Sequence, residues 1–323
     1  MTAVVDLALG PPARGADARV ASPGLAILAA RLSDGDAAVA HLLAAQAALP
    51  GRRSNLFEGT AGTVGAALVV RGTVEDPRLE RVVAPGVGWL ARQARDLARR
   101  CRPVPEVFDA VAGLAGLGRL LLLAREFGYD RAGPGLDAAL RALTGVVPVD
   151  AGQVRPGMAH GLAGPVALLA VALGAGVAVP GQRDALHAAA HRLAAWPAEG
   201  RHQWCVGTAG IARAVQLAGR ALADPVLTRV GTDALAAIAG QPADRWGVRD
   251  AMLCCGHAGV LRTALSAGLP EVADAAAAAI VAGRRPESGP ASLLYGDAGV
   301  ALALYDHAHP DQPATWPALL LVE

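Results

Sequence analysis

Aromatic residues and net charge are both scarce in this sequence. Phe, Tyr and Trp make up 3% of its 323 residues, and 29 basic against 28 acidic side chains leave a formal net charge of +1. A protein that binds nucleic acid needs a basic surface for phosphates and, for unpaired bases, aromatic side chains on which they stack. The composition lacks both, so we expect no nucleic-acid partner.

The sequence also lacks a signal-peptide pattern, since no basic stretch precedes the first apolar run and Asp6 interrupts that run. We therefore expect a cytoplasmic protein, with a disordered tail over residues 1–20. One segment, Pro156–Gln182, has no Asp, Glu, Lys or Arg and exceeds the ~20 residues of a membrane-spanning helix. Prolines and glycines interrupt it, so we predict two shorter elements separated by turns and no membrane span.

Small and aliphatic residues are abundant instead. Hydrophobic residues make up 53% of the sequence, Ala and Leu dominate them, and Gly occurs 39 times. This much apolar surface drives collapse against chain entropy, so the chain is not a disordered one. Its core must be built from closely approaching backbones, because large rings are few.

A glycine motif recurs along the chain with a nearly constant period. The string Gly-x-Ala-Gly occurs six times, with starts 54, 48, 46, 49 and 40 residues apart, at Gly59, Gly113, Gly161, Gly207, Gly256 and Gly296. An apolar run follows each copy, and amphipathic segments lie between copies, at Val87–Arg100, Leu136–Leu143, Arg183–Ala195 and Leu227–Ile238. Such a period is typical of repeat architectures, so each repeat is predicted to combine an inner apolar helix with an outer amphipathic one.

Helical hairpins of one hand form a curved array, and a curved array can close on itself. We therefore predict an all-α fold, an α/α toroid of six to seven hairpins that forms a single domain over residues 1–323. The glycine turns gather at one end, and Val20–Leu49 supplies the seventh hairpin. The alternative is an open α-solenoid, which requires polar capping repeats at its ends. The apolar segment Trp316–Val322 favours closure.

If the glycine turns converge, the residues directly before them converge too. Cys205, Cys254 and Cys255 hold such positions, as do His160 and Asp109. Thiolates that meet in a reducing compartment suit tetrahedral Zn²⁺, and three protein ligands leave a fourth position open for a substrate. The alternative is that these cysteines pack as small buried hydrophobes.

The same segments carry a family resemblance. They are Phe108–Gly116, Met158–Gly164, Arg201–Gly210 and Leu253–Gly259. In order and spacing they resemble the motifs of the LanC family of lanthionine cyclases. The resemblance implies an α/α toroid in which zinc activates a cysteine thiol of a dehydrated precursor peptide. That thiolate adds to a dehydroalanine or dehydrobutyrine and closes a thioether ring.

The resemblance implies the zinc ligands residue by residue. It assigns zinc to Cys205 and Cys254, and the third ligand to Cys255, where the family's usual Cys-His-Gly is Cys-Cys-Gly. His257, two positions later, is the competing third ligand. A third thiolate ligand adds negative charge that an imidazole would not. We therefore predict that the substrate thiolate bound to this zinc is a more reactive and less discriminating nucleophile. At Val206 the family often has Tyr, and that polar contact is missing here.

The resemblance also implies three catalytic residues. His160 is the candidate acid that delivers a proton to the enolate carbon, because its ordinary pKa is near ~6.5. Asp109 orients or balances the site, and Arg201 holds the enolate or the sulfur. From the residues alone, an Asp before a helix is an N-cap and a His before a glycine turn is a capping or core residue. Trp204 packs the metal-binding loop.

Other patterns in the sequence are weaker evidence for a functional site. His187 and His191 stand at i and i+4 in an outer segment without the glutamate of a zinc-protease helix, so we interpret them as a solvated face. Cys101 lies among arginines of another outer segment and is interpreted as an incidental thiol. Glu58 and Asp297 flank glycine turns without an assigned role.

We predict a freestanding, zinc-dependent lanthionine cyclase. No second region has the length or composition of a dehydratase or kinase, so separate dehydratase or kinase/lyase enzymes would supply the dehydrated precursor peptide. The alternatives are the addition of glutathione or another thiol to dehydroamino acids, and a peptide-binding scaffold with structural zinc. A prenyltransferase-like toroid needs an aromatic pocket, for which this chain has too few aromatic residues.

Overall fold

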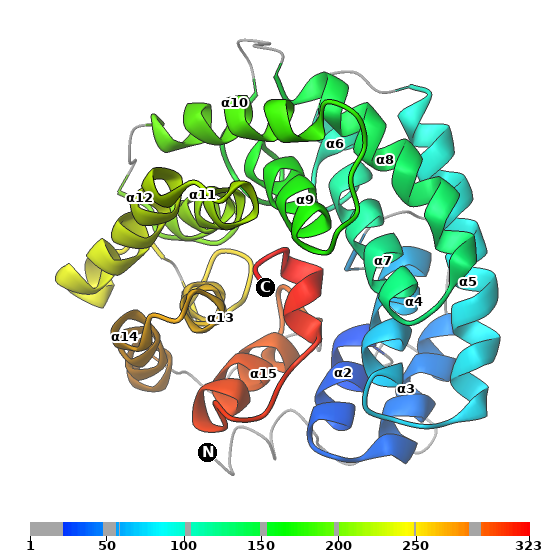
Figure 1. Cartoon of the computed structure of the whole chain (residues 1–323). Helices are drawn as coiled ribbons and strands as arrows, with labels where there is room; N and C mark the ends of the chain where they lie inside the picture. The colour runs from blue at the N-terminus through cyan, green and yellow to red at the C-terminus, as the bar shows by residue number, and fades with distance from the viewer. Residues whose placement is uncertain are drawn as a thin grey trace.

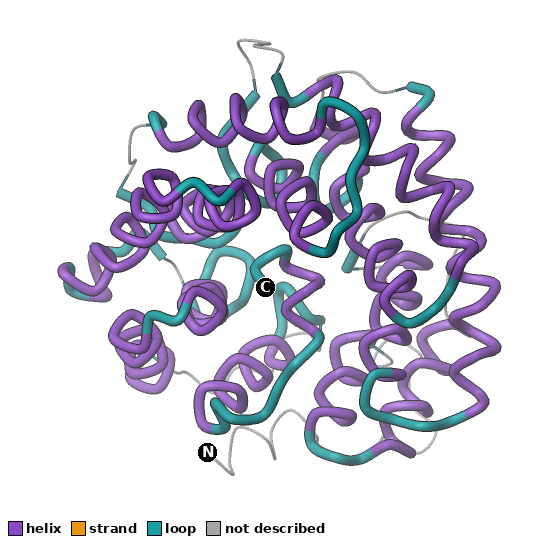
Figure 2. Tube along the Cα trace, viewed as in Figure 1, coloured by secondary structure: helices purple, strands orange, loops and turns teal. Residues whose placement is uncertain are grey.

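The computed structural model describes residues 22–47, 56–57, 59–100, 105–148, 154–196, 200–248, 250–283 and 292–323. Within these ranges the chain consists of helices joined by loops, and it has no strand (Figure 2). Glu58, Cys101 and the predicted tail over residues 1–20 lie outside the described residues.

Among the described residues, seven helices form the inner layer of a ring (Figure 1). They are α2 (Pro23–Arg31), α4 (Gly59–Arg71), α7 (Leu114–Glu126), α9 (Ala163–Gly174), α11 (Thr208–Leu222), α13 (His257–Ala267) and α15 (Asp297–Ala308). Each contacts the next in this order, and α15 contacts α2, so the ring is closed. The predicted toroid is confirmed, and the open solenoid is excluded.

An outer layer of helices covers this ring. It comprises α3 (Gly35–Ala47), α5 (Pro77–Ala98), α8 (Gly133–Val146), α10 (Gln182–Ala194), α12 (Pro225–Ala236) and α14 (Pro270–Ala282). Each packs on the inner helix that precedes it in the chain. The short helices are α6 (Pro105–Phe108), η1 (Asp130–Ala132), η2 (Ala237–Gly240), η3 (Ala243–Arg245) and η4 (Trp316–Leu320). Helices α2 and α3 form the seventh hairpin that was predicted within Val20–Leu49.

The glycine motif shapes the start of each inner helix. Gly207 and Gly256 are extended N-caps of α11 and α13. Three residues later, a Cβ on Gly210 would lie 2.1 Å from the carbonyl oxygen of Trp204, and the same holds for Gly259 and Leu253. Only glycine lets the preceding loop fold back this closely onto the first turn of the helix.

Two predicted segments differ from the structure. Helix α5 begins at Pro77, ten residues before Val87, because Asp76 caps it and accepts a hydrogen bond from the backbone N–H of Arg78 at 2.7 Å. Pro156–Gln182 contains one complete helix, α9, and reaches only the first residue of α10, because loops occupy the rest of the segment. None of the described helices is both long and apolar enough to cross a membrane.

The C-terminal segment enters the middle of the ring, where η4 lies beside the inner helices (Figure 1). Leu320 and Val322 are fully buried. Trp204 Nε1 donates a hydrogen bond to the carbonyl oxygen of Leu320 at 3.0 Å, and Arg213 Nε donates to that of Val322 at 2.8 Å. The predicted apolar segment thus packs beneath the loop that carries Cys205.

A buried ionic network holds the closing contact of the ring. The Asp306 carboxylate on α15 lies 2.8 Å from Arg31 Nε on α2 and 2.8 Å from an Arg262 guanidinium nitrogen on α13. Trp316 Nε1 also donates to Asp306, at 2.8 Å. One carboxylate therefore joins both neighbours of α15 and the start of η4.

Candidate metal and catalytic site

Backbone hydrogen bonds link the loops before the inner helices into a continuous chain. The N–H of Ala110 donates to the carbonyl oxygen of Ala159 at 3.1 Å, and the N–H of Ala159 donates to that of Cys205 at 3.0 Å. The N–H of Cys205 donates to the oxygen of Cys254 at 3.3 Å, and the N–H of Cys254 to that of Leu294 at 3.1 Å. These bonds bring the flanks of the glycine turns together at one end of the toroid.

Three cysteines meet in this ring of loops. Sγ of Cys255 lies 3.2 Å from Sγ of Cys205 and 3.5 Å from Sγ of Cys254, and all three sulfur atoms lie within 4.8 Å of one another. They are free thiols, because a disulfide would bring two sulfurs to ~2.05 Å. Tetrahedral zinc with Zn–S bonds of ~2.3 Å places its sulfur ligands ~3.8 Å apart. The three sulfurs can therefore hold a metal ion, and zinc would require the two shorter separations to widen by ~0.3–0.6 Å.

The pKa values of the three cysteine thiols also bear on cation binding. Hydrogen bonds from Cys205 and Cys255 lower the pKa of Cys254 to about 6. The hydrogen bond to Cys254 raises the pKa of Cys205, and burial raises the pKa of Cys255. The thiolate form is thus favoured at Cys254 over its two neighbours. A divalent cation would offset the repulsion among three thiolates.

His257 lies apart from the thiols. Its Nδ1 is 3.0 Å from the carbonyl oxygen of Asp250, and its ring centroid is 5.8 Å from that of Trp246. Within the described residues, the group of side chains that can hold a metal with Cys205 and Cys254 contains Cys255 and not His257. The geometry therefore favours the Cys-Cys-Gly interpretation of the third ligand.

His160 and Asp109 form a close pair in the same ring. Nδ1 of His160 lies 2.6 Å from Oδ2 of Asp109, whose residue is 1% exposed. Oδ1 of Asp109 accepts hydrogen bonds from the N–H groups of Ala112 at 2.7 Å and Gly113 at 2.9 Å. One carboxylate thus fixes the turn before α7 and orients the imidazole. The N-cap of α7 is Gly113, so Asp109 acts on the turn before the helix and not as its N-cap.

This pair alters the protonation of the imidazole. The hydrogen bond to Asp109 raises the pKa of His160 above its ordinary value, partial burial opposes it, and the charges of Asp109 and Cys254 raise it further. With Nδ1 directed at the carboxylate, Nε2 is the ring nitrogen left to exchange a proton. The side chain is 59% exposed, so a ligand from outside the ring has access to it.

Sequence reasoning gave no role to Tyr295, although it directly precedes the last glycine turn. A hydrogen bond from its side chain contributes to the low pKa of Cys254. Tyr295 holds the position before Gly296 that Cys255 holds before Gly256. This shared position directly before a glycine motif is the sequence feature that could have identified Tyr295. Its hydroxyl supplies a polar contact to the cluster that Val206 lacks.

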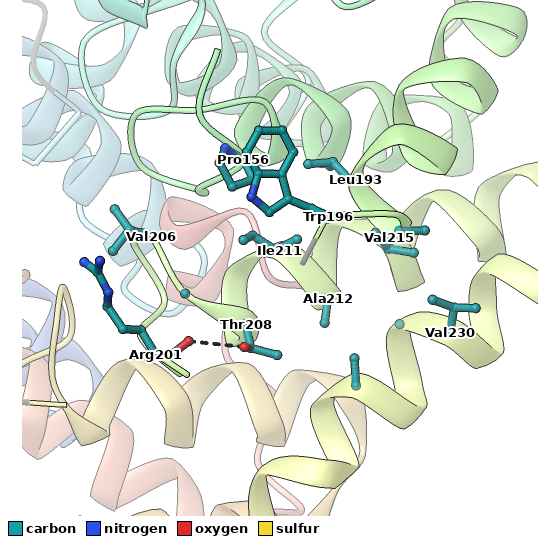
Figure 3. Close-up of a pocket in the computed structure, with 14 residues that line it drawn as sticks. Pro156, Leu193, Trp196, Arg201, Val206, Thr208, Ile211, Ala212, Val215 and Val230 are labelled. Carbon is teal, nitrogen blue, oxygen red and sulfur yellow. Dashed lines mark hydrogen bonds between the residues drawn. The ribbon is translucent and has the colours of Figure 1, made fainter. Parts of the chain in front are cut away.

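A groove lies beside the cysteine cluster, between α10, α11 and α12 (Figure 3). Apolar side chains line most of it, among them Trp196, Ile211 and Val230. At one end its lining includes Val206, the residue that follows Cys205. The groove therefore begins at the loop that carries the first thiol.

Arg201 lies at this same end of the groove. Its backbone oxygen accepts hydrogen bonds from the N–H and hydroxyl of Thr208 at 2.8 and 3.1 Å, which fixes the loop on the start of α11. Its guanidinium lies beside Val206 in Figure 3. The structure thus brings Arg201 to the groove that adjoins the cysteine loop.

The family model for lanthionine synthetase C-like proteins matches residues 35–269. The chain belongs to the lanthionine synthetase C-like family. Among solved structures, nisin cyclase is similar to this family member, with a TM-score of 0.80 and 17% sequence identity over 99% of this chain and 97% of that chain. No curated protein matches the chain. The resemblance deduced from the four glycine-flanking segments is confirmed for the family and the fold.

Proposed function

We propose that this protein closes thioether rings in a dehydrated precursor peptide, by adding a cysteine thiol of the peptide to a dehydroalanine or dehydrobutyrine. Zn²⁺ held by Cys205, Cys254 and Cys255 is the proposed cofactor. Separate dehydratase or kinase/lyase enzymes would supply the dehydrated peptide, in the cytoplasm. The observation that carries the proposal is that three free thiols and the His160–Asp109 pair share one ring of loops.

The metal and the imidazole have different tasks in this reaction. Zn²⁺ bound by three thiolates supplies positive charge that lowers the pKa of a substrate thiol, so that its thiolate is present at neutral pH. The sulfur–carbon bond then forms at the β-carbon, the π electrons of the alkene move toward the carbonyl as an enolate, and the α-carbon takes up a proton. Protonated His160 donates that proton from Nε2, while its Nδ1–H remains bonded to Asp109.

The remaining proton and charge are also accounted for. The proton that leaves the substrate thiol restores the His160 imidazolium, so the addition needs no oxidant or reductant. The Arg201 guanidinium is the proposed partner of the developing enolate oxygen. The groove that begins at Val206 is the proposed seat of apolar peptide side chains next to the reacting cysteine, because it is continuous with the loop of Cys205.

The test uses the purified protein and a peptide that contains one cysteine and one dehydroalanine. Metal analysis should find zinc in the wild type and little in Cys205→Ala. Ring closure leaves the peptide mass unchanged and removes one free thiol, which alkylation followed by mass spectrometry counts. Zinc binding with no loss of peptide thiol would favour the scaffold alternative. In a second assay that also contains glutathione, a peptide that gains the mass of one glutathione and forms no ring would favour the addition of an external thiol to the dehydroamino acid.

A further inference from the structure

A second cluster of metal-ligating side chains lies on the outer layer of the toroid. His187 and His191 stand one turn apart on α10, and Asp224 is the N-cap of α12. The two Nε2 atoms are 3.1 Å apart, and Oδ2 of Asp224 lies 3.8 Å from Nε2 of His191. All three ligand atoms lie within 4.8 Å of one another. The sequence showed only the two histidines, because Asp224 comes from the next hairpin.

The carboxylate of Asp224 is held in place by its own helix. Its Oδ1 accepts hydrogen bonds from the N–H groups of Val226 at 2.9 Å and Leu227 at 3.0 Å. These bonds, with the nearby imidazoles, lower the pKa of Asp224, so the group is ionised at neutral pH. Because Oδ1 is committed to the helix, Oδ2 is the oxygen that faces His191. The third ligand is therefore oriented before any metal arrives.

We propose that His187, His191 and Asp224 form a second site, for a divalent transition-metal ion such as Zn²⁺ or Ni²⁺. Metal–imidazole and metal–carboxylate bonds of ~2.0–2.2 Å place ligand atoms ~2.8–3.6 Å apart in octahedral or tetrahedral geometry. The 3.1 Å separation of the two Nε2 atoms already matches, whereas Oδ2 of Asp224, at 3.8 Å from Nε2 of His191, must come a few tenths of an ångström closer. Two imidazoles and one carboxylate are a ligand set that such ions accept.

The surroundings leave room for further ligands. The His191 side chain is 48% exposed and that of Asp224 is 22% exposed, so water can occupy the remaining positions on the metal. Arg183 and Asp184 line the same surface hollow as His187 and Asp224, with charges of opposite sign. The alternative is a plain hydrogen bond, in which the two imidazoles share one Nε2 proton and no metal binds.

A metal at this site would join two consecutive hairpins. Helix α10 and the start of α12 supply the ligands, and Leu193 of α10 and Val230 of α12 both line the groove beside the cysteine loop. Figure 1 shows the two helices in the outer layer, with α10 above α11 and α12 to its left. The bound ion would thus fix the spacing of the groove walls and stabilise the folded state by mass action. This site is separate from the thiol cluster and does not depend on the proposed function.

The test measures Ni²⁺ binding to the intact protein after chelation and dialysis. We expect the wild type to bind one more equivalent of Ni²⁺ than His187→Ala/His191→Ala does, and its Tm to rise with Ni²⁺ concentration by more than that of the double variant. Asp224→Asn keeps Oδ1 as the helix cap but replaces Oδ2 with an amide nitrogen. It should therefore retain the fold and weaken Ni²⁺ binding at this site at least tenfold.

His307→Ala is the matched control. It removes a half-buried imidazole whose Nε2 lies 2.7 Å from a carboxylate oxygen of Asp274, but which has no third ligand among the described residues. It should leave the stoichiometry and the Ni²⁺-dependent Tm unchanged. Equal stoichiometry in the wild type and the double-histidine variant, or unchanged affinity in Asp224→Asn, would overturn the three-ligand site. Circular dichroism of each variant distinguishes lost binding from lost folding.

Discussion

Nδ1 of His160 lies 2.6 Å from Oδ2 of Asp109, and this contact raises the pKa of the imidazole. A raised folded-state pKa keeps His160 protonated to higher pH. The stability that the pair contributes is therefore fully present below the unfolded pKa of ~6.5 and is lost as pH rises through the raised value. The proposed acid form is lost over the same upper range.

Asp109→Asn should move the loss of the protonated form of His160 to lower pH. The amide keeps Oδ1 as acceptor for the N–H groups before α7, but its nitrogen cannot accept the Nδ1–H bond of His160. The alkaline limb of the ring-closure rate should shift to lower pH, and the rate at pH 8 should fall by about tenfold, less than the ~10²–10⁴-fold cost of losing a general acid outright. A pH–rate profile that coincides with that of the wild type would rule out the pairing as a source of the acid form.

Cys255 should be required for tight zinc binding, and histidine should replace it in part. Cys255→Ala removes one ligand and should lower zinc affinity by more than the ~10–100-fold that loss of a residue hydrogen-bonded to a ligand costs, measured by competition with a chelator. Cys255→His replaces the thiolate with a neutral imidazole ligand. One zinc per chain should therefore remain, while ring closure becomes slower and more selective. Unchanged rate and ring pattern in Cys255→His would contradict the predicted effect of the third thiolate.

The repeat and the thiol cluster could be predicted from sequence because both follow one register. Each glycine motif begins an inner helix, so residues at the same offset before it, such as His160 and Cys255, reach the same end of the ring. Closure of that ring depends on contacts between distant segments. Asp306 meets Arg31 across 275 residues, and no local pattern indicates that pairing.

Other features escaped sequence reasoning for related reasons. The position of Leu320 beneath Trp204 depends on the chain turning inward after α15, and an apolar terminal segment alone does not specify that turn. The ligand set of His187 and His191 is completed by Asp224, whose sequence signal is that of a helix cap. A residue with one evident local role is easily overlooked for a second one.

The closing network should contribute to stability. Asp306→Asn removes the charge that faces Arg31 and Arg262, of which each side chain is 11% exposed. Breaking a buried ion pair from one side costs ~3–5 kcal/mol, so we expect a loss of about 3 kcal/mol in the free energy of unfolding by urea. Asp274→Asn is the control, because its carboxylate is 73% exposed and its pair with His307 is a surface one. Equal effects of the two variants would contradict a special role for Asp306.

The second glycine of each motif should tolerate no side chain. The Cβ of Gly210→Ala would lie 2.1 Å from the Trp204 oxygen and 2.7 Å from Met158 Cβ, so the cysteine loop must shift. Overpacking of this kind costs ~1–3 kcal/mol, and zinc affinity should fall with stability. Gly145→Ala is the matched control on α8, where a Cβ meets nothing within 4 Å. It should raise the Tm, because glycine inside a helix costs ~0.5–1 kcal/mol relative to alanine.

The groove that begins at Val206 should affect peptide binding more than chemistry. Val230→Asp places a charge on its apolar wall, so the KM for the dehydrated peptide should rise about tenfold, which corresponds to ~1.4 kcal/mol, while kcat changes little. Val226→Asp is the control on the same helix, because Val226 is 58% exposed and does not line the groove. A KM that rises equally in both variants would indicate a general charge effect. A fall in kcat alone in Val230→Asp would mean that the groove acts on the reacting atoms and not on peptide binding.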